Sequence, residues 1–130
     1  MSVFNPVIYF EIPVTDMQRA KQFYNAVFEF EFDPETIDGY EMMHFPFYQS
    51  ANGISGALAK GDVYIPSKNG IIVYFKTENI DETLTRVIAN NGRILYPKTV
   101  NEKYGFVVAE FEDSEGNRIA LHQTISIGGL

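Results

Sequence analysis

The sequence predicts an α+β domain built from two tandem βαβββ units, and three observations support this fold class. Several short segments have the alternating or continuous apolar residues that are typical of strands, and two longer segments have the apolar spacing of helices. The order of one strand, one helix and three strands occurs twice. The chain has 130 residues, a length typical of one domain. We therefore expect a single domain over 1–130, with an internal repeat at 5–60 and 69–124 and a linker at about 60–69.

The first repeat begins with an expected strand at 7–13 and a helix at 15–28. Thr15 and Gln18 have the spacing of a capping box, which predicts the helix start. Two turn sequences, Asp38-Gly39 and Asn52-Gly53, separate the segments that follow. These segments predict three strands, at about 30–33, 40–48 and 54–59.

The second repeat has the same order of elements. Asn79 is the expected N-cap of its helix, and Gly92 is the expected left-handed residue after that helix. Glu115-Gly116 predicts the turn before the last strand. We expect strands at 70–76, 93–96, 104–112 and 117–123, and a helix at 79–91.

The two repeats align at one offset of 63 residues, which pairs Tyr9 with Ile72 (72 − 9) and Gly53 with Gly116 (116 − 53). The identity between the repeats is weak, so the alignment depends on element order and register. Such an internal repeat favours an architecture of two similar units.

Composition limits the possible partners. The net charge of −7 would repel a phosphate backbone, so we expect no nucleic-acid partner, and an anionic membrane surface is disfavoured for the same reason. No apolar stretch approaches the ~20 residues of a membrane span, and residues 1–14 lack the basic residues of a signal peptide. There is no cysteine, which fits a reducing compartment. We expect a cytoplasmic protein.

Motifs in five segments are informative about the family. Residues 9–16 read Tyr-Phe-Glu-Ile-Pro-Val-Thr-Asp, and further motifs are Arg19-Ala20 with Phe23-Tyr24, Ser55-Gly-Ala-Leu58, Val73-Tyr-Phe75, and the closing segment 111–122 with its Glu115-Gly-Asn-Arg-Ile119 turn. Together they resemble the vicinal oxygen chelate superfamily of glyoxalase, bleomycin-resistance and extradiol dioxygenase proteins. The resemblance covers about residues 5–124 and is closest to uncharacterised proteins related to lactoylglutathione lyase.

This resemblance implies two curved mixed-sheet half-barrels, each with its helix outside and a binding site on the concave face. It also implies that metal-dependent members carry His or Gln on the first strand of a unit and Glu on the last. The corresponding residues here are Tyr9, Ala57, Ile72 and Ala120. Alanine and isoleucine offer no ligand atom. We therefore expect no metal and no cofactor at these positions.

Strand alternation predicts which residues line the pocket. Ile8, Phe10 and Ile12 are expected to face the helix, so that Tyr9 and Glu11 face the site. The repeat and the last strands extend this face, and the expected pocket residues are Tyr9, Glu11, His44, Ala57, Ile72, Tyr74, Ala120 and His122. Small residues at 57 and 120 would leave room for a ligand between two tyrosines. The alternative is that these side chains fill a closed core.

Three titratable residues are candidates for chemistry. Glu11 is the one carboxylate in an apolar strand, and burial would fit it to act as a general base, although a partner could instead hold it in a structural role. His122 could do acid–base work or lie at a solvent edge. His44 has apolar neighbours on both sides, so its face stays open. Nothing in the spacing favours a metal site of Glu11, His44 and His122.

The sequence leaves four functions open. The first is a metal-free protein that binds a small apolar or cationic molecule in an aromatic pocket. The second is a metal-independent isomerase or lyase acting on a small carbonyl compound through Glu11 or His122. The third is a metal-dependent lyase with displaced ligands, and the fourth is an interaction domain. We also expect a homodimer, because exposed sheet edges invite pairing.

Overall fold

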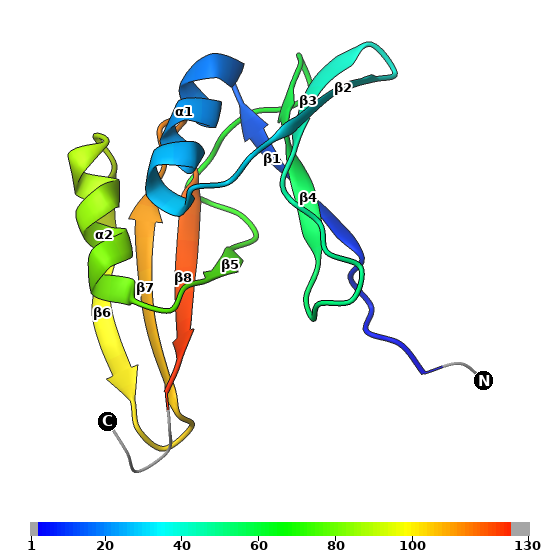
Figure 1. Cartoon of the computed structure of the whole chain (residues 1–130). Coiled ribbons are helices and arrows are strands. Elements are labelled where there is room, and N and C mark those ends of the chain that lie inside the picture. The colour runs from blue at the N-terminus through cyan, green and yellow to red at the C-terminus, as the bar shows by residue number, and fades with distance from the viewer. Residues whose placement is uncertain (1–2, 126–130) are drawn as a thin grey trace.

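Each half of the chain forms one four-stranded mixed sheet and one helix (Figure 1). The computed structural model describes residues 3–125. The first module, residues 9–60, contains β1 (Tyr9–Val14), α1 (Met17–Phe28), β2 (Asp33–Ile37), β3 (Tyr40–His44) and β4 (Ser55–Lys60). The second module, residues 73–124, contains β5 (Val73–Lys76), α2 (Ile80–Ala89), β6 (Arg93–Asn101), β7 (Phe106–Glu112) and β8 (Arg118–Thr124).

The two modules have the same sheet topology. The strand orders are β1-β4-β3-β2 and β5-β8-β7-β6, with the first strand parallel to the last and the remaining pairs antiparallel. The two sheets stay separate and do not close into a barrel (Figure 1). The predicted α+β fold of two βαβββ units is confirmed.

One hydrophobic core joins the modules. It contains residues from both helices and from the buried faces of both sheets, and α1 and α2 contact each other beside it (Figure 1). Its largest fully buried side chains include Tyr24 of α1, Phe111 of β7 and Leu58 of β4. Because each helix buries its apolar face in this shared core, the opposite faces of the sheets are left for other contacts.

Alternation along β1 separates the two faces as predicted. Ile12 and Val14 are buried in the core and Phe10 packs against it, whereas Tyr9 and Glu11 are exposed on the opposite face. The expectation for Ile8 is wrong, because this residue precedes β1 and is 84% exposed. The strand begins two residues later than the apolar pattern suggested.

Several other strand boundaries differ from expectation, and β5 and β7 begin at Val73 and Phe106 instead of 70 and 104. β2 lies at Asp33–Ile37 instead of 30–33, and β3 ends at His44 instead of continuing to 48. Pro46 follows and has no N–H to donate to a neighbouring strand. β6 continues through Pro97 to Asn101, because it is an edge strand whose register shifts around the proline.

The helix ends are set by short polar side chains. Asp16 caps α1 by accepting the Arg19 N–H at 3.0 Å, so the N-cap is one residue after the expected Thr15. Asn79 caps α2 as predicted. The left-handed residue after α2 is Asn91 at φ 70°, and the expectation of Gly92 there is wrong.

The turn between β7 and β8 binds the two modules together. The Tyr24 hydroxyl donates to Asp113 at 2.7 Å, and the Asn117 amide donates to the backbone oxygen of Pro13 at 2.8 Å. Glu115 accepts from the Thr15 and Asp16 N–H groups, each at 2.9 Å. This turn therefore fixes the start and the middle of α1 against the second sheet.

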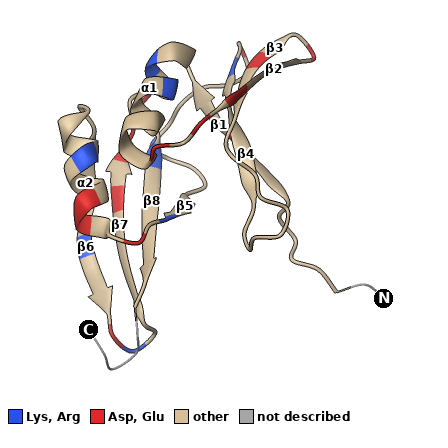
Figure 2. Cartoon of the chain, viewed as in Figure 1, with Lys and Arg blue, Asp and Glu red and all other residues tan. Residues whose placement is uncertain are grey.

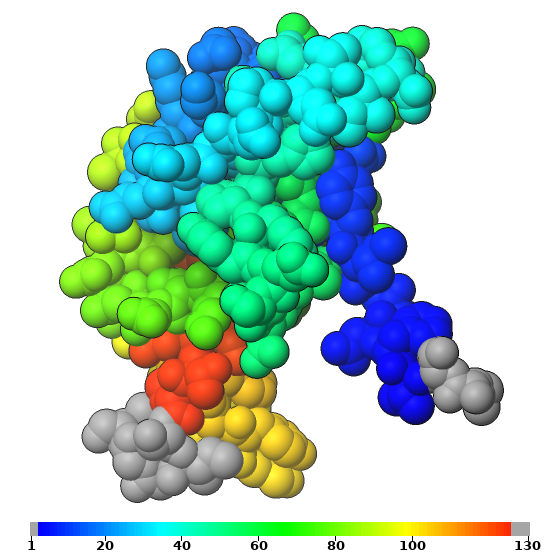
Figure 3. Space-filling view, turned by 45° about the vertical axis from the view of Figure 1, so that its right-hand side comes forward, coloured from blue at the N-terminus to red at the C-terminus, as the bar shows by residue number. Residues whose placement is uncertain are grey.

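An N-terminal arm, residues 3–8, extends away from the body of the protein (Figure 3). Its apolar side chains are strongly exposed, among them Val3, Phe4, Val7 and Ile8. Within residues 3–125, no helix is both long and apolar enough to cross a membrane.

Candidate ligand-binding site

A cavity of about 890 Å³ lies between β1 and β5, the first strands of the two modules. This volume is within the range typical of ligand pockets. Most of its wall is apolar, and its polar groups include Glu11, Lys76, Ser55 and Asn52. The aromatic residues that line it are Tyr9, Phe10, Phe30, Phe45, Tyr74 and Phe75. Such a wall suits a ligand with an apolar or aromatic body.

Four of the eight expected pocket residues line this cavity. They are Tyr9 and Glu11 of β1, with Ile72 and Tyr74 at the corresponding positions of the second module. His44 lines a neighbouring hollow of about 520 Å³ that shares Tyr9. Neither hollow is lined by the other three, Ala57, Ala120 and His122.

The small residues of β4 do not leave the open space that the sequence suggested. Ala57 and Ala59 are fully buried together with Met42, and the rings of Tyr40 and Tyr64 pack against them. Tyr64 comes from the segment between the modules, which was predicted from the sequence only as a linker. The one sequence feature that could have indicated Tyr64 as a site residue is its aromatic ring within a segment bounded by Gly61 and Pro66.

Glu11 is held by two tyrosine hydroxyls. Tyr64 donates to its Oε1 at 2.8 Å and Tyr9 to its Oε2 at 3.1 Å. Burial and then the Glu11 charge raise the pKa of Tyr9 to about 12, and the hydrogen bond to Glu11 raises the pKa of Tyr64. Both tyrosines are therefore neutral donors at neutral pH, and Glu11 is the group of this trio suited to accept a proton or to face a cation.

His44 lies beside an acidic edge. Its Nε2 atom is 3.1 Å from Oε2 of Glu35, and its ring is 6.5 Å from that of Tyr9. Glu31 and Asp33 line the same hollow as Glu35. Figure 2 shows acidic residues along the segment after α1 and on the β2–β3 hairpin. The sequence did not predict which face of the sheet His44 lies on. In the structure it lies beside Tyr9, on the side of the acidic hollow.

On the exposed face of the second module, acidic side chains form ion pairs with basic ones. Glu110 pairs with Arg118, and Glu112 lies 2.6 Å from Arg93 and 3.6 Å from Lys68. His122 is half-buried and stacks on Phe106, with ring centroids 5.4 Å apart. It lies on another sheet from Glu11 and His44, so the structure does not bring these three residues together.

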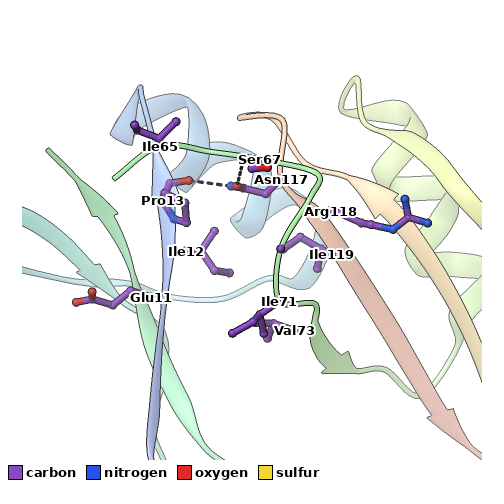
Figure 4. A pocket seen from close by; sticks show the side chains of 11 residues that line it. Glu11, Ile12, Pro13, Ile65, Ser67, Ile71, Val73, Asn117, Arg118 and Ile119 are labelled. Atoms are coloured by element: carbon purple, nitrogen blue, oxygen red, sulfur yellow. Dashed lines mark hydrogen bonds between the residues drawn. The ribbon is translucent and has the colours of Figure 1, made fainter. Parts of the chain in front are cut away.

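A smaller hollow of about 270 Å³ lies between β1 and the start of β8, and it shares Glu11, Ile71 and Val73 with the main cavity (Figure 4). Ile12, Ile71 and Ile119 line it, while the Glu11 carboxylate and the Arg118 guanidinium point away from it (Figure 4). The Asn117 side chain spans one end, where it donates to Pro13 and accepts the Ser67 N–H at 3.1 Å. This hollow has less than a third of the volume of the main cavity, so it is the weaker candidate for a ligand site.

The residues at the superfamily metal positions do not fit a metal ion. Ala57 and Ala120 are fully buried and have no ligand atom, and Ile72 has none. Tyr9 uses its hydroxyl on Glu11. Among residues 3–125, no three His, Cys, Asp or Glu side chains lie close enough together to hold a metal. A catalytic metal normally needs three protein ligands, so we derive no chemistry through one.

The fold and the sequence define the class of this protein. A family model of the Glyoxalase/Bleomycin resistance protein/Dioxygenase superfamily matches residues 7–121. The chain belongs to this superfamily, as its motifs indicated. No curated protein matches the sequence significantly.

Several solved structures share the fold. UcmS2 has a TM-score of 0.68 at 20% identity, with 94% of this chain and 100% of that chain covered. TnmS3, an antibiotic binding protein from Streptomyces sp. CB03234, has a TM-score of 0.65 at 20% identity, over 95% and 99% of the two chains. A glyoxalase I mutant from Zea mays has a TM-score of 0.70 at 17% identity, over 91% of this chain and 46% of that chain. At such identities the likeness concerns the fold alone.

Proposed function

We propose that this protein binds a small apolar or cationic molecule in the cavity between β1 and β5, without a metal ion. The observation that carries the proposal is the cavity itself, which combines about 890 Å³ of space with six aromatic side chains. A cavity of this kind can bury most of a small ligand, and burial of apolar surface supplies the affinity.

Two further observations favour binding over metal chemistry. The superfamily positions for metal ligands carry Tyr9, Ala57, Ile72 and Ala120. The neighbour TnmS3 is described as an antibiotic binding protein, and it matches along nearly its full length. A protein with this fold can therefore serve to hold a small molecule.

The test uses two matched tyrosine variants. Tyr74 lines the cavity and is 53% exposed, and Tyr104 is 64% exposed in the turn between β6 and β7, outside the cavity lining. A library of aromatic amines and neutral aromatic compounds is screened by thermal shift, because a ligand that binds the native state raises the melting temperature. We expect hits whose shift is lost in Tyr74→Ala and kept in Tyr104→Ala. Equal loss in both variants would contradict a site in this cavity.

A second candidate function is a metal-independent isomerase or lyase that acts on a small carbonyl compound. It is supported by Glu11, the one carboxylate among the described residues of the cavity wall, which two neutral tyrosines orient. In this scheme Glu11 would accept a proton from the carbon next to the carbonyl. Turnover that disappears in Glu11→Gln and persists in His122→Ala would support it, because His122 is not among the lining residues.

The same proposal includes a homodimer and a cytoplasmic location. The exposed apolar side chains of the N-terminal arm and the free edges of β1 and β5 are the features that favour a dimer. The acidic composition and the lack of cysteine fit the cytoplasm.

A further inference from the structure

Glu11 is a carboxylate with hydrogen-bond donors but no cation. Both of its oxygens accept from tyrosine hydroxyls, at 2.8 and 3.1 Å. Among residues 3–125, no Lys, Arg or His nitrogen lies within 4.0 Å of it. The two hydroxyls orient the carboxylate but leave its negative charge uncompensated.

In the second module, the acidic side chains of the sheet are paired with basic ones. Glu110 and Glu112 on the corresponding exposed face are paired with Arg118 and with Arg93 and Lys68. The position that corresponds to Glu11 in the repeat is Tyr74 (74 − 11 = 63), which lines the same cavity. The cavity therefore has the carboxylate of Glu11 on its β1 wall and the ring of Tyr74 at the corresponding position on its β5 wall.

The surroundings of Glu11 favour a positive ligand group. Tyr9 carries the hydroxyl that donates to Glu11, and its ring belongs to the cavity lining. Aromatic faces attract cations, and the attraction adds to that of a nearby carboxylate. The acidic hollow of Glu31, Asp33 and Glu35 adjoins the same tyrosine. Of the described residues that line the cavity, Lys76 is the one basic residue, and it makes no ion pair with Glu11.

We propose that Glu11, held between the hydroxyls of Tyr9 and Tyr64, anchors the ammonium group of an amine whose apolar body lies in the cavity. This inference rests on the proposed binding function and narrows it to a substrate class, the protonated aromatic or alkyl amines. Tyr64 acts as a positioning residue, because its hydroxyl holds the carboxylate and its ring covers the alanines of β4.

The experiment compares three probes that share one phenyl ring, by calorimetry at low ionic strength. They are 2-phenylethylammonium, the neutral 2-phenylethanol and the anion 3-phenylpropanoate. We expect the cation to bind about tenfold more tightly than the alcohol, which corresponds to one charge-assisted hydrogen bond. The anion should bind more weakly than the alcohol. In Glu11→Gln the cation should lose its advantage, whereas Glu102→Gln, an equal change of charge in the exposed β6–β7 turn, should keep it.

The outcomes separate this inference from the proposed function. If the alcohol binds in the cavity but the cation gains nothing in the native protein, the Glu11 anchor is overturned and the binding function stands. An equal loss in Glu11→Gln and Glu102→Gln would mean that overall charge, and not the anchor, attracts the amine. If none of the three probes binds, the anchor and the proposed function are both overturned. The comparison of the three probes uses the native protein, so it can contradict the proposal even if a variant fails to fold.

Discussion

The hydroxyl of Tyr24, in the middle of α1, donates a 2.7 Å hydrogen bond to Oδ2 of Asp113, which follows β7 of the other module. Both side chains are buried. Burial raises the pKa of the Asp113 carboxyl, while its hydrogen bonds to Tyr24 and Asn117 act in the opposite direction. The pair is a polar contact inside the core that joins the two modules.

Removal of this hydroxyl should destabilise the whole chain. In Tyr24→Phe the buried carboxyl of Asp113 keeps its Asn117 donor but loses the tyrosine hydroxyl, and the loss of a hydrogen bond to a buried acceptor costs about 1–3 kcal/mol. We expect urea unfolding to show a loss of that size. Tyr48→Phe, on an exposed side chain, is the control and should leave the unfolding midpoint unchanged. Unchanged stability in Tyr24→Phe would contradict a structural role for the contact.

The hydrogen bonds that Glu115 accepts from the start of α1, called the Glu115 clamp below, should make the stability of the protein depend on pH in the acidic range. Its side chain is fully buried, and it accepts from Arg19, Thr15 and Asp16. Burial alone would raise the pKa of the Glu115 carboxyl, but these donors outweigh burial and lower it from 4.5 to about 2. A lowered carboxyl pKa stabilises the folded state above the unfolded value and loses this contribution as the pH falls through the folded value.

The measurement is the free energy of unfolding from pH 6 to pH 2, for the native protein and for Glu115→Gln. A shift of this size corresponds to at most about 3.4 kcal/mol, and solvent around the half-exposed Arg19 screens part of it. We expect the native protein to lose about 1–2 kcal/mol of its advantage over the variant between pH 4.5 and pH 2. Parallel curves would show that the clamp does not contribute. Asp113 titrates in both proteins, so its opposite effect largely cancels in the difference.

Much of the fold follows from local sequence patterns, because period-two and period-3.6 spacing set which residues are buried. Ile12 and Glu11 lie on the faces that alternation predicted, and Asn79 caps α2 as predicted. One boundary that failed depends on the position of its strand in the sheet. β6 passes through Pro97 only because it is an edge strand, which no local pattern reveals.

The candidate site was harder to predict, because one of its residues comes from a segment without a periodic pattern. Tyr64 covers Ala57 and Ala59, so the space that the small residues suggested is filled from within the chain. Its hydrogen bond to Glu11 joins residues 53 positions apart. Tyr9, Glu11, Ile72 and Tyr74 line one cavity, because the repeat relates β1 to β5, and their role in binding stays a prediction.

The protein should not bind a catalytic divalent metal at the superfamily positions. We expect no stoichiometric metal after purification without chelator, and no tight binding when Zn²⁺, Ni²⁺, Mn²⁺ and Fe²⁺ are titrated. The reason is that Ala57, Ile72 and Ala120 offer no ligand atoms. Tight binding of one ion per chain that Glu11→Ala or His122→Ala abolishes would return metal-dependent lyase chemistry to consideration.

The protein should be a homodimer at micromolar concentration. The N-terminal arm exposes Val3, Phe4, Val7 and Ile8, and burial of this apolar surface against a second copy would stabilise the pair. Light scattering should give twice the mass of the 14.8 kDa chain. Phe4→Asp with Ile8→Asp should shift the mass toward the monomer, and Val63→Asp with Ile65→Asp, on other exposed apolar residues, should not. A monomeric mass for the native protein would contradict this prediction.

A crystal structure of the protein soaked with 2-phenylethylammonium would show directly where the amine binds. We expect one probe molecule in the cavity between β1 and β5, with its ring among Phe45, Tyr74 and Phe75 and its nitrogen within hydrogen-bond distance of Glu11. An empty cavity at saturating probe, or a probe bound only outside it, would contradict the claim that this cavity is the binding site.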